Sequence, residues 1–363
     1  MSDLKQYDAY LADDGPAALV IREYLMPVEG VDGVVFPATF ASGDGFPGGY
    51  NIDPAPNGAN VCLIDSVGSQ ANRIEPLFLR DKYKALVPQV VVRAGEREVN
   101  LLEAGHRAGD AIIRCSALQD RLQAAFKAVL KGDAEPLARI APTSLVFGVW
   151  DSRDTQAKLP RLVASTIRAF SVTRLTRSAQ YVPATEYVDE GLLDASSDKA
   201  TSDIYAERGF VHVPATGSHG GVIAHGGIRR DATLGLAALR GLHAKGDEKS
   251  LALRRYILGL ALTAFTHSIP AYLRQGCLLV PDPDKPREFT EVQANGVRKP
   301  ISISHDQALA YAIAAAQAFG VGEGEVVAFD RNLAKKDVTK EEKAKSKAKG
   351  KKAKGSDTVE STP

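Results

Sequence analysis

Two long glycine-rich segments are the feature that most limits how this 363-residue chain can fold. Residues 39–60 are crowded with Gly, Pro, Asn and Asp, and residues 181–227 are irregular again and include the run GSHGGVIAHGG. Both segments are too long and too rich in turn-forming residues to be simple connections, which rarely exceed about 15 residues. Because long ordered loops often carry binding functions, we expect both segments to project from the folded body.

Strand and helix patterns alternate through the rest of the chain. Short apolar and β-branched runs predict strands at 18–25, 31–36, 144–150, 210–213, 277–280 and 325–329, and a hairpin over 90–102 that turns at Ala94–Gly95. Helical spacing of apolar residues predicts helices at 118–130, 160–170, 249–266 and 306–319. The last of these is preceded by a capping box of Ser304 and Gln307. Intermingled strands and helices with long loops predict an α+β fold.

The 160–170 segment is predicted to be an amphipathic helix with a basic face. Pro160 suits a first helical turn, and the apolar residues that follow it recur with a period near 3.6. Arg161 and Arg168 fall on the opposite face. The surrounding residues 152–177 contain six Lys or Arg against one Asp, and this local surplus predicts a basic surface.

Charge is divided unevenly between the body of the chain and its end. Residues 331–363 contain eleven Lys or Arg and five Asp or Glu, which leaves residues 1–330 at a net charge of −5 within a total of +1. The 331–363 segment lacks aromatic residues, so burial cannot offset the entropy of ordering it, and a disordered Lys-rich tail is predicted. We interpret this tail as a solubilising extension, with attraction to phosphate as the alternative.

Composition excludes several classes of protein. The 44% hydrophobic and 25% charged residues are typical of a soluble globular chain. No apolar run approaches the roughly 18 residues that span a bilayer, and the first residues have no export signal, so no membrane partner is expected. Three widely separated cysteines without metal-ligand spacing argue against a disulfide scaffold or structural zinc. These features predict a cytoplasmic protein.

Nucleotide and hydrolase signatures are weak or missing in the sequence. Gly43, Gly45 and Gly48 match GxGxxG, but Pro47 and the turn-rich residues after it prevent the helix whose N-terminus would hold a pyrophosphate. The patterns GxxxxGK[ST], HExxH and GxSxG do not occur. The sequence therefore predicts no cofactor.

Candidate metal ligands and acid–base groups do not form a recognisable pattern either. His212, His219 and His225 lie within fourteen residues, but their spacing matches no common ligand arrangement. Four acidic residues are interpreted as loop and turn residues, because spacing alone defines no carboxylate pair: Asp32, Asp44, Asp53 and Asp65. We predict no metal and no catalytic residue.

Three segments combine donors suited to phosphate and sugar oxygens. SVGSQANRIEP at 66–76 is predicted as a helix start rich in hydroxyl, amide and guanidinium groups, although Asn72 and Glu75 could equally form a capping box there. VWDSRDTQAKLPR at 149–161 leads from a predicted strand into the basic-faced helix. GGVIAHGGIRRD at 220–231 joins glycines, which permit close backbone approach, to two arginines.

Several blocks of the chain together resemble a known family. They are GSQANRIEP at 68–76, LVFGVWDSRDTQAKLPRLVASTIRAF at 145–170, GGVIAHGGIRRDATL at 220–234, and LRRYILGLAL with LRQGCLLV within 253–280. These blocks are similar to the CRISPR-associated RAMP superfamily protein of type I-G (formerly I-U) systems, the Csb-one type of the Cas-seven backbone subunits of Cascade. The resemblance runs in order to about residue 330. It implies one domain over 1–330, an RRM-like (ferredoxin-like) palm with finger and thumb insertions near 39–60 and 181–230.

The resemblance also implies a function and partners. Such subunits are non-catalytic and polymerise head to tail along CRISPR RNA, which leaves the guide spacer free to pair with target DNA in antiviral defence. Other Cascade subunits, including the large and guide-processing subunits, and a helicase-nuclease are the further partners implied. We predict RNA-backbone contacts at the residues that match the family blocks: Ser69, Gln70, Asn72, Arg73, Arg153, Gln156, Lys158, Arg161, Arg229 and Arg230.

Two alternative functions stay open at this point. Related subunits of type III complexes cut target RNA with an aspartate, so one alternative is a metal-dependent ribonuclease of the RAMP superfamily that uses Asp44 or the histidine group. The other is a scaffold whose contacts are all with protein. The absence of aromatic RNP motifs fits a protein that grips the RNA backbone and does not read bases.

Overall fold

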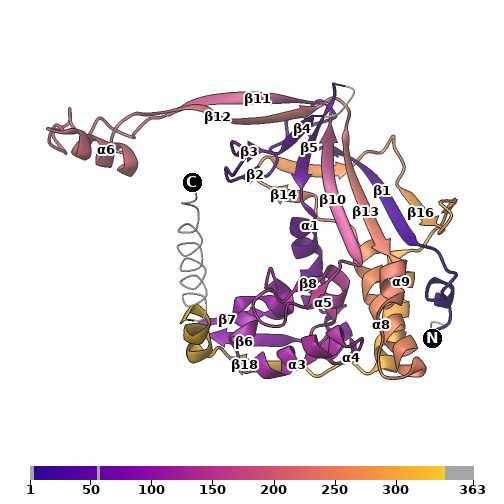
Figure 1. The fold of residues 1–363 in the computed structure, drawn as a ribbon. Helices are drawn as coiled ribbons and strands as arrows, with labels where there is room; N and C mark the ends of the chain where they lie inside the picture. The colour runs from indigo at the N-terminus through magenta and orange to yellow at the C-terminus, as the bar shows by residue number, and fades with distance from the viewer. Residues whose placement is uncertain (1–3, 55–57, 340–363) are drawn as a thin grey trace, which may run out of the picture.

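A computed structural model describes residues 4–54 and 58–339 of the chain. An antiparallel sheet forms the centre of the molecule (Figure 1). Its strands lie in the order β14-β15-β1-β13-β10-β5-β4, with β16 also paired to β1 and β17 paired to β16. The bounds are β1 (Ala18–Pro27), β4 (Ile52–Pro54), β5 (Asn60–Asp65), β10 (Val163–Phe170), β13 (Ile228–Gly235), β14 (Tyr272–Arg274), β15 (Cys277–Pro281), β16 (Glu288–Val292) and β17 (Arg298–Pro300). The sheet is curled. Its curvature brings Arg274 of β14, the first strand in the order, into contact with Asp65 of β5, the sixth.

The segment 163–170 is a central strand, so the helix predicted over 160–170 is wrong. Buried residues alternate along β10 from Val163 to Ala169, and the strand pairs with β13 on one side and β5 on the other. Val, Thr and Ile in VASTIRAF are β-branched and fit a pleated surface better than a helix. A short apolar run is compatible with both periods, and pairing on two edges decided between them.

Two long helices pack together beside the sheet (Figure 1). They are α8 (Asp247–Thr266) and α9 (His305–Phe319). Gly259 of α8 permits their close approach, because a Cβ there would lie 2.8 Å from the Cα of Ala312. The predicted capping box of Ser304 and Gln307 begins α9 and is confirmed.

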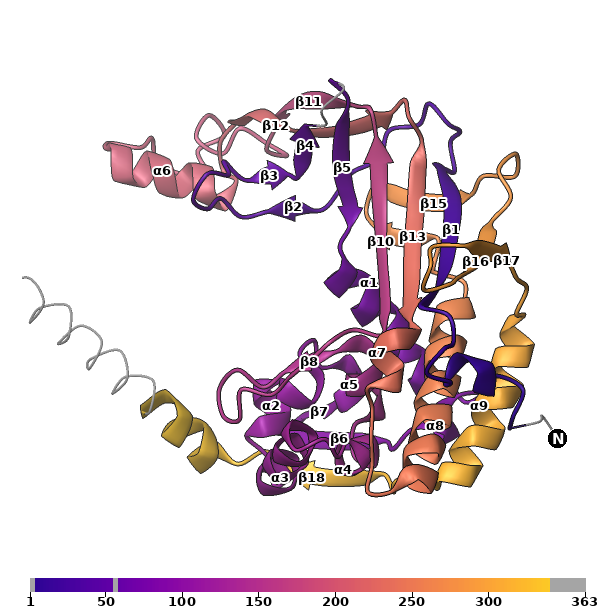
Figure 2. The ribbon, with the colours of Figure 1, turned by 45° about the vertical axis from the view of Figure 1, so that its right-hand side comes forward.

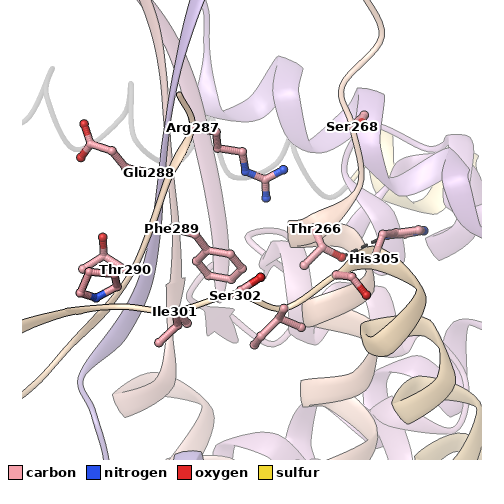
Figure 3. A pocket seen from close by; sticks show the side chains of 12 residues that line it. Thr266, Ser268, Arg287, Glu288, Phe289, Thr290, Ile301, Ser302 and His305 are labelled. Atoms are coloured by element: carbon pink, nitrogen blue, oxygen red, sulfur yellow. Dashed lines mark hydrogen bonds between the residues drawn. The ribbon is translucent and has the colours of Figure 1, made fainter. Parts of the chain in front are cut away.

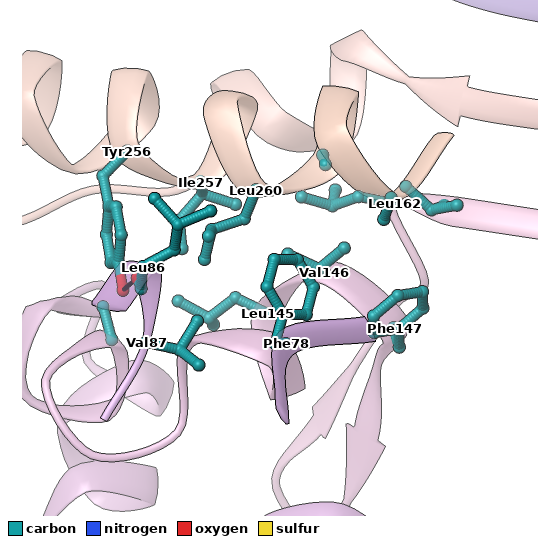
Figure 4. Packing of buried hydrophobic residues seen from close by; sticks show 14 of the residues in the cluster. Phe78, Leu86, Val87, Leu145, Val146, Phe147, Leu162, Tyr256, Ile257 and Leu260 are labelled. Carbon is teal, nitrogen blue, oxygen red and sulfur yellow. Dashed lines mark hydrogen bonds between the residues drawn. The ribbon is translucent and has the colours of Figure 1, made fainter. Parts of the chain in front are cut away.

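The main hydrophobic core joins α8 to the segments before and within α5 (Pro142–Phe147). Figure 4 shows Tyr256, Ile257 and Leu260 of α8 facing Leu86 and Val146. The hydroxyl of Tyr256 donates to the carbonyl oxygen of Leu86 at 2.8 Å, which satisfies the one polar atom that this side chain buries. The long helices therefore pack against the segment 75–160 through this core.

The lower arm is built from residues 75–160 together with one strand from near the C-terminus (Figure 2). Its elements are β6 (Val90–Ala94), β7 (Arg97–Asn100), α2 (Ala111–Arg114), α3 (Gln119–Leu130), α4 (Glu135–Ala138), α5, β8 (Val149–Trp150), β9 (Lys158–Leu159) and β18 (Glu325–Ala328). β18 pairs in parallel with β6, and β6 forms the predicted hairpin with β7. The strand predicted at 144–150 is wrong in part, because Pro142 begins a helix that Gly148 ends before β8.

A long hairpin forms most of the other arm (Figures 1 and 2). It consists of β11 (Val172–Tyr181) and β12 (Val213–Ala224), with α6 (Lys199–Arg208) at its outer end. The short strands β2 (Thr39–Phe40) and β3 (Gly49–Tyr50) lie beneath it, and the GxGxxG glycines fall in their connection, which is not helical. The strand predicted at 31–36 reduces to a single bridge between Val35 and Val222.

The remaining predicted elements differ in outcome. Helices α3 and α8 and strands β1, β15 and β18 confirm the predictions at those positions. Residues 331–339, predicted as the start of a disordered tail, are helical, and Asp337 pairs with Arg114; the rest of the predicted tail lies outside the described residues. None of the helices in the described part of the chain is long and apolar enough to span a membrane.

Candidate nucleic-acid interface

Helix α1 (Val67–Ile74) follows β5 directly and lies between the two arms of the curved molecule (Figure 2). Ser66 is its N-cap, and the Ser66 side chain accepts a hydrogen bond from the Ser69 backbone N–H at 3.2 Å. The alternative capping box of Asn72 and Glu75 is wrong, because these residues stand at the end of the helix. The polar segment predicted at 66–76 is therefore presented by a short, capped helix on the inner side of the molecule.

Asp65 organises the polar side chains at this helix. Its carboxylate is completely buried and accepts hydrogen bonds from Ser69 Oγ at 2.9 Å and from Gln70 Nε2 at 2.7 Å. It also accepts from Arg73 Nε at 3.2 Å and from Arg274 Nη2 at 2.5 Å. A buried carboxylate with two guanidinium partners and two neutral donors is well compensated, and it holds all four side chains in fixed positions.

The two arginines at Asp65 keep part of their surface accessible. The Arg73 side chain is 27% exposed and the Arg274 side chain 23%, whereas Asp65 is not exposed at all. The solvent-facing part of this cluster is therefore cationic, and oriented guanidinium groups suit phosphate oxygens. The sequence-based prediction missed both Asp65, interpreted as a turn residue, and Arg274; the signal that was available is an Asp placed directly at the end of a strand.

A second polar group connects the end of α1 to the lower arm. Arg107 donates from Nη2 to Asn72 Oδ1 and from Nη1 to the Gly148 carbonyl oxygen, both at 3.3 Å. Gly148 has φ +77°, and a Cβ there would lie 2.9 Å from Cγ of Arg161. Asn72 and Arg161, predicted separately, are thus both neighbours of Arg107, and Arg161 itself is exposed.

Arg107, which contacts Asn72, also forms a buried ion pair with Glu75. Arg107 Nε lies 2.6 Å from Glu75 Oε2, and both side chains are buried. Burial raises the pKa of Glu75 to about 7, while the positive charge of Arg107 acts in the opposite direction. Burial also lowers the pKa of Arg107, and the nearby Arg161 adds to that effect. Arg107 positions Asn72 through its hydrogen bond to the Asn72 side chain. Because Arg107 and Glu75 are both buried, neither side chain is a surface contact.

The loop between β8 and β9 and the first residue of β9 carry three of the predicted RNA-contact residues. Arg153, Gln156 and Lys158 are exposed, and Lys158 Nζ lies 5.4 Å from the centre of the Trp150 ring. Gln156 has φ +62°, and its Nε2 donates to the Ser152 carbonyl oxygen at 2.5 Å. The loop therefore presents cations beside an exposed aromatic ring, a combination that suits nucleic acid.

Two of the residues predicted to contact RNA are buried in the structure. Gln70 is completely buried, and its amide is used by Asp65 and by Ser165, whose Oγ donates to Gln70 Oε1 at 2.9 Å. Arg230 is 2% exposed, and its Nε donates to Glu23 at 2.7 Å. Both residues stabilise the interior, because their donors point away from solvent.

Arg229 is separated from the α1 cluster by the sheet itself. Neighbouring residues of a strand point to opposite faces, so Arg229 lies on the face opposite Arg230 and the buried residues of β13. It pairs with Asp231 at 3.0 Å and stacks over Phe170 at 4.8 Å. The structure therefore brings Ser69 and Arg73 together and Asn72 near Arg161, but it places Arg229 elsewhere.

The histidines of the 181–230 segment make separate contacts. His212 pairs with Glu186 at 2.7 Å, His219 packs against Tyr50, and His225 is hydrogen-bonded to Thr173 at 2.9 Å. Within residues 4–54 and 58–339, no group of three or more His, Cys, Asp or Glu is arranged to hold a metal ion. The histidine group considered for a ribonuclease does not assemble in the described structure.

A further pocket of about 700 Å³ lies where α8 ends, α9 begins and β16 passes (Figure 3). Arg287, Phe289 and Ser302 line it, and Thr266 Oγ1 lies 3.1 Å from His305 Nδ1. Burial lowers the pKa of His305 and lowers that of the neighbouring His267 to about 4. None of the predicted contact residues lines this pocket.

The fold and this site define a mixed α/β protein with a cationic, amide-bearing inner side. Residues 19–174 match the model of the family described as CRISPR-associated protein GSU0053. The matched region runs from β1 into β11 and includes α1, Asp65 and the β8–β9 loop. This match supports a CRISPR-associated protein with a role in CRISPR defence. No curated protein sequence matches the chain.

Proposed function

We propose that this protein is a non-catalytic, CRISPR RNA-binding backbone subunit of a type I-G Cascade complex. The observation that carries the proposal is the buried carboxylate of Asp65, which holds Arg73 and Arg274 as partly exposed cations beside α1. Phosphate and sugar contacts give a sequence-independent grip, which is what a protein needs when the guide itself reads the target sequence. The family match supports the CRISPR context of this proposal.

The topology of the sheet supports an RRM-like palm. In chain order, β1 leads through α1 to β10, then to β13, and through α8 to β15. In space these four strands lie in the order β15-β1-β13-β10. This order supports the proposal, because a βαββαβ ferredoxin-like unit is expected to place strand four beside strand one and strand three between one and two. The hairpin β11–β12 is then an insertion between the second and third strands.

The proposed partners follow from this role. Copies of the chain line up head to tail on the guide, whose exposed bases pair with target DNA, and other Cascade subunits and a helicase-nuclease complete the cytoplasmic complex. A head-to-tail contact joins two different surfaces and extends into a filament when it does not close. The protruding hairpin is the element that best suits reaching a neighbouring copy, because it extends away from the body (Figure 1).

Co-expression with a CRISPR array provides the first test. We expect the purified protein to carry RNA of guide length, measured as a high ratio of absorbance at 260 to 280 nm and by sizing the extracted RNA. Recovery of a nucleic-acid-free monomer from cells that contain abundant guide would overturn the proposal. Incubation of labelled RNA with Mg²⁺ or Mn²⁺ tests the ribonuclease alternative, which would replace the proposal if cleavage occurs and Asp44→Ala abolishes it.

A charge variant tests the site itself. Arg73→Gln with Arg274→Gln should weaken binding of single-stranded RNA and reduce the slope of log affinity against log salt by about 0.7 for each phosphate that the protein no longer neutralises. Arg93→Gln is the matched control, since Arg93 is also paired with an acid, Glu98 at 2.7 Å, but lies on β6. Equal affinity and slope in the double variant and the control would contradict an RNA contact at Arg73 and Arg274.

A further inference from the structure

We propose that the pocket beside Trp150 binds one nucleotide of a single-stranded nucleic acid, with the indole ring stacked on its base. This inference rests on the proposed function, because it assumes that nucleic acid reaches the inner side of the lower arm. It goes beyond the backbone contacts predicted from the sequence, since it assigns a base contact to a chain without aromatic RNP motifs.

Trp150 is unusually exposed for its size and lies at the end of strand β8. The residue is 57% exposed, although a large apolar ring gains free energy from burial. Its backbone pairs with Lys158 across β8 and β9, and the next residue, Asp151, is buried and accepts from Thr155 N at 2.8 Å. An exposed ring on an ordered support is pre-organised for stacking, so little entropy is lost when a base binds.

The pocket at this ring has the size and chemistry of a nucleotide site. Its volume is about 650 Å³, within the range of about 300 to 1,000 Å³ that ligand sites occupy. Arg114, Arg153, Ser152 and His106 line it together with Trp150. An aromatic face provides stacking for any base, and guanidinium and hydroxyl groups provide donors for the sugar and phosphate.

The helical segment 331–339 forms the far wall of this pocket. Asp337 and Val338 line it, and Asp337 pairs with Arg114, which also lies 3.8 Å from Asp154. A phosphate that approaches Arg114 therefore competes with the Asp337 carboxylate for the same guanidinium. Removing the charge of Asp337 should raise the affinity for nucleic acid, whereas a pocket without a nucleotide role would show no such gain.

The single tryptophan of the chain makes the test direct, because all indole fluorescence comes from Trp150. A twelve-residue oligouridylate should quench this fluorescence over the same concentration range in which a labelled copy shows binding by anisotropy. Trp150→Leu should lower the affinity about 5- to 150-fold, as expected for the loss of one stacked base. Trp150→Phe should retain most of it, and Asp337→Asn should raise it at low salt.

Tyr181→Ala is the matched control, since Tyr181 is 52% exposed but lies on the β11–β12 hairpin, and its affinity should not change. Oligothymidylate distinguishes the two sources of the nucleotide: quenching by RNA alone indicates the guide, and quenching by DNA indicates the target. Binding by anisotropy without quenching, and with equal affinity for Trp150→Leu, would overturn this inference and leave the proposed function standing. Absence of binding by either method would overturn both.

Discussion

The helices α8 and α6 show how differently the body and the projecting hairpin are stabilised. In α8, 13 of the 20 residues are buried, and the helix packs between α9 and the lower arm. In α6, among its ten described residues, none is buried. A helix with a continuous buried surface obtains its stability from tertiary packing, whereas α6 depends on its cap at Asp198 and on local contacts. The body therefore supplies stability, and the hairpin offers surface.

The body and the hairpin also differ in how deeply their charged side chains are buried. Asp65, Arg230 and the pair of Glu75 with Arg107 are buried in the body, and Glu23, the partner of Arg230, is only 12% exposed. In the hairpin, the ion pair of His212 with Glu186 is exposed. Because a buried charge needs its partner and an exposed charge has water, variants of these groups measure the difference between the two regions.

The largest expected effect is at Arg230. Arg230→Met removes the buried guanidinium that donates to Glu23, although the positive charge of Arg287 stays nearby, and we expect a loss of about 3 to 5 kcal/mol in the free energy of unfolding. Arg229→Met, one residue away on the other face, should cost no more than about 1 kcal/mol. Denaturant titration of both variants checks this, and similar losses for the two would contradict the assignment of faces.

A somewhat smaller loss is expected at Asp65. Asp65→Ala removes the acceptor shared by Ser69, Gln70, Arg73 and Arg274, but the two arginines can still reach water, so we expect about 3 kcal/mol. Asp44→Ala, in the exposed connection of β2 and β3, serves as the control and should change stability by less than about 0.5 kcal/mol. If the Asp44 variant were the less stable of the two, the organising role of Asp65 would be refuted.

The pH dependence of the body should include a contribution from His267. Burial lowers the pKa of His267 to about 4, with His305 and Arg80 adding to the shift, whereas an unfolded histidine titrates near 6.5. The unfolded state therefore binds more protons between these values, and stability is lost as pH falls from about 6.5 to 4. His267→Asn should remove on the order of 1 kcal/mol of this loss, measured as the difference between denaturant midpoints at pH 7 and pH 4.5. An unchanged pH profile would show that His267 titrates normally.

The smallest effect on stability is expected from the hairpin. Replacing residues 182–212 with a short Gly-Asn turn removes α6 and the buried Pro183 but no member of the two hydrophobic clusters, so the free energy of unfolding should change by no more than about 1 kcal/mol. The same variant should lose the ability to form long assemblies on a guide, measured by sizing of the co-expressed complex. A large loss of stability would show that the hairpin belongs to the body after all.

Elements with one strong local signal were predictable. The capping box at Ser304, the turn at Gly95 and the long apolar run of α8 each specify one conformation, and the structure confirms them. The segment 163–170 was not predictable in this way, because its apolar residues fit a helical and a strand period alike. Pairing with β5 and β13 decides between the two periods. β5 is at least 98 residues away in sequence, and β13 is at least 58 residues away.

The candidate site shows the same division. The sequence identified the polar segments around Ser69 and Arg161, and the family block that contains Arg274, but not the role of each side chain. Asp65 and Arg274 are 209 residues apart and meet only because the sheet curls. Gln70 looked like a surface donor, yet the fold buries it beside Asp65.

What the sequence determined by itself is the set of local conformations, the apolar runs that must be buried and the segments rich in cationic and amide groups. These features depend on residues a few positions apart, and their spacing can be read directly from the sequence. The tertiary structure alone decided which arginine is buried and which is accessible, since Arg229 and Arg230 differ only in the face of the strand they occupy. That choice depends on desolvation and on partners that are distant along the chain, and neither can be known until the strands have paired.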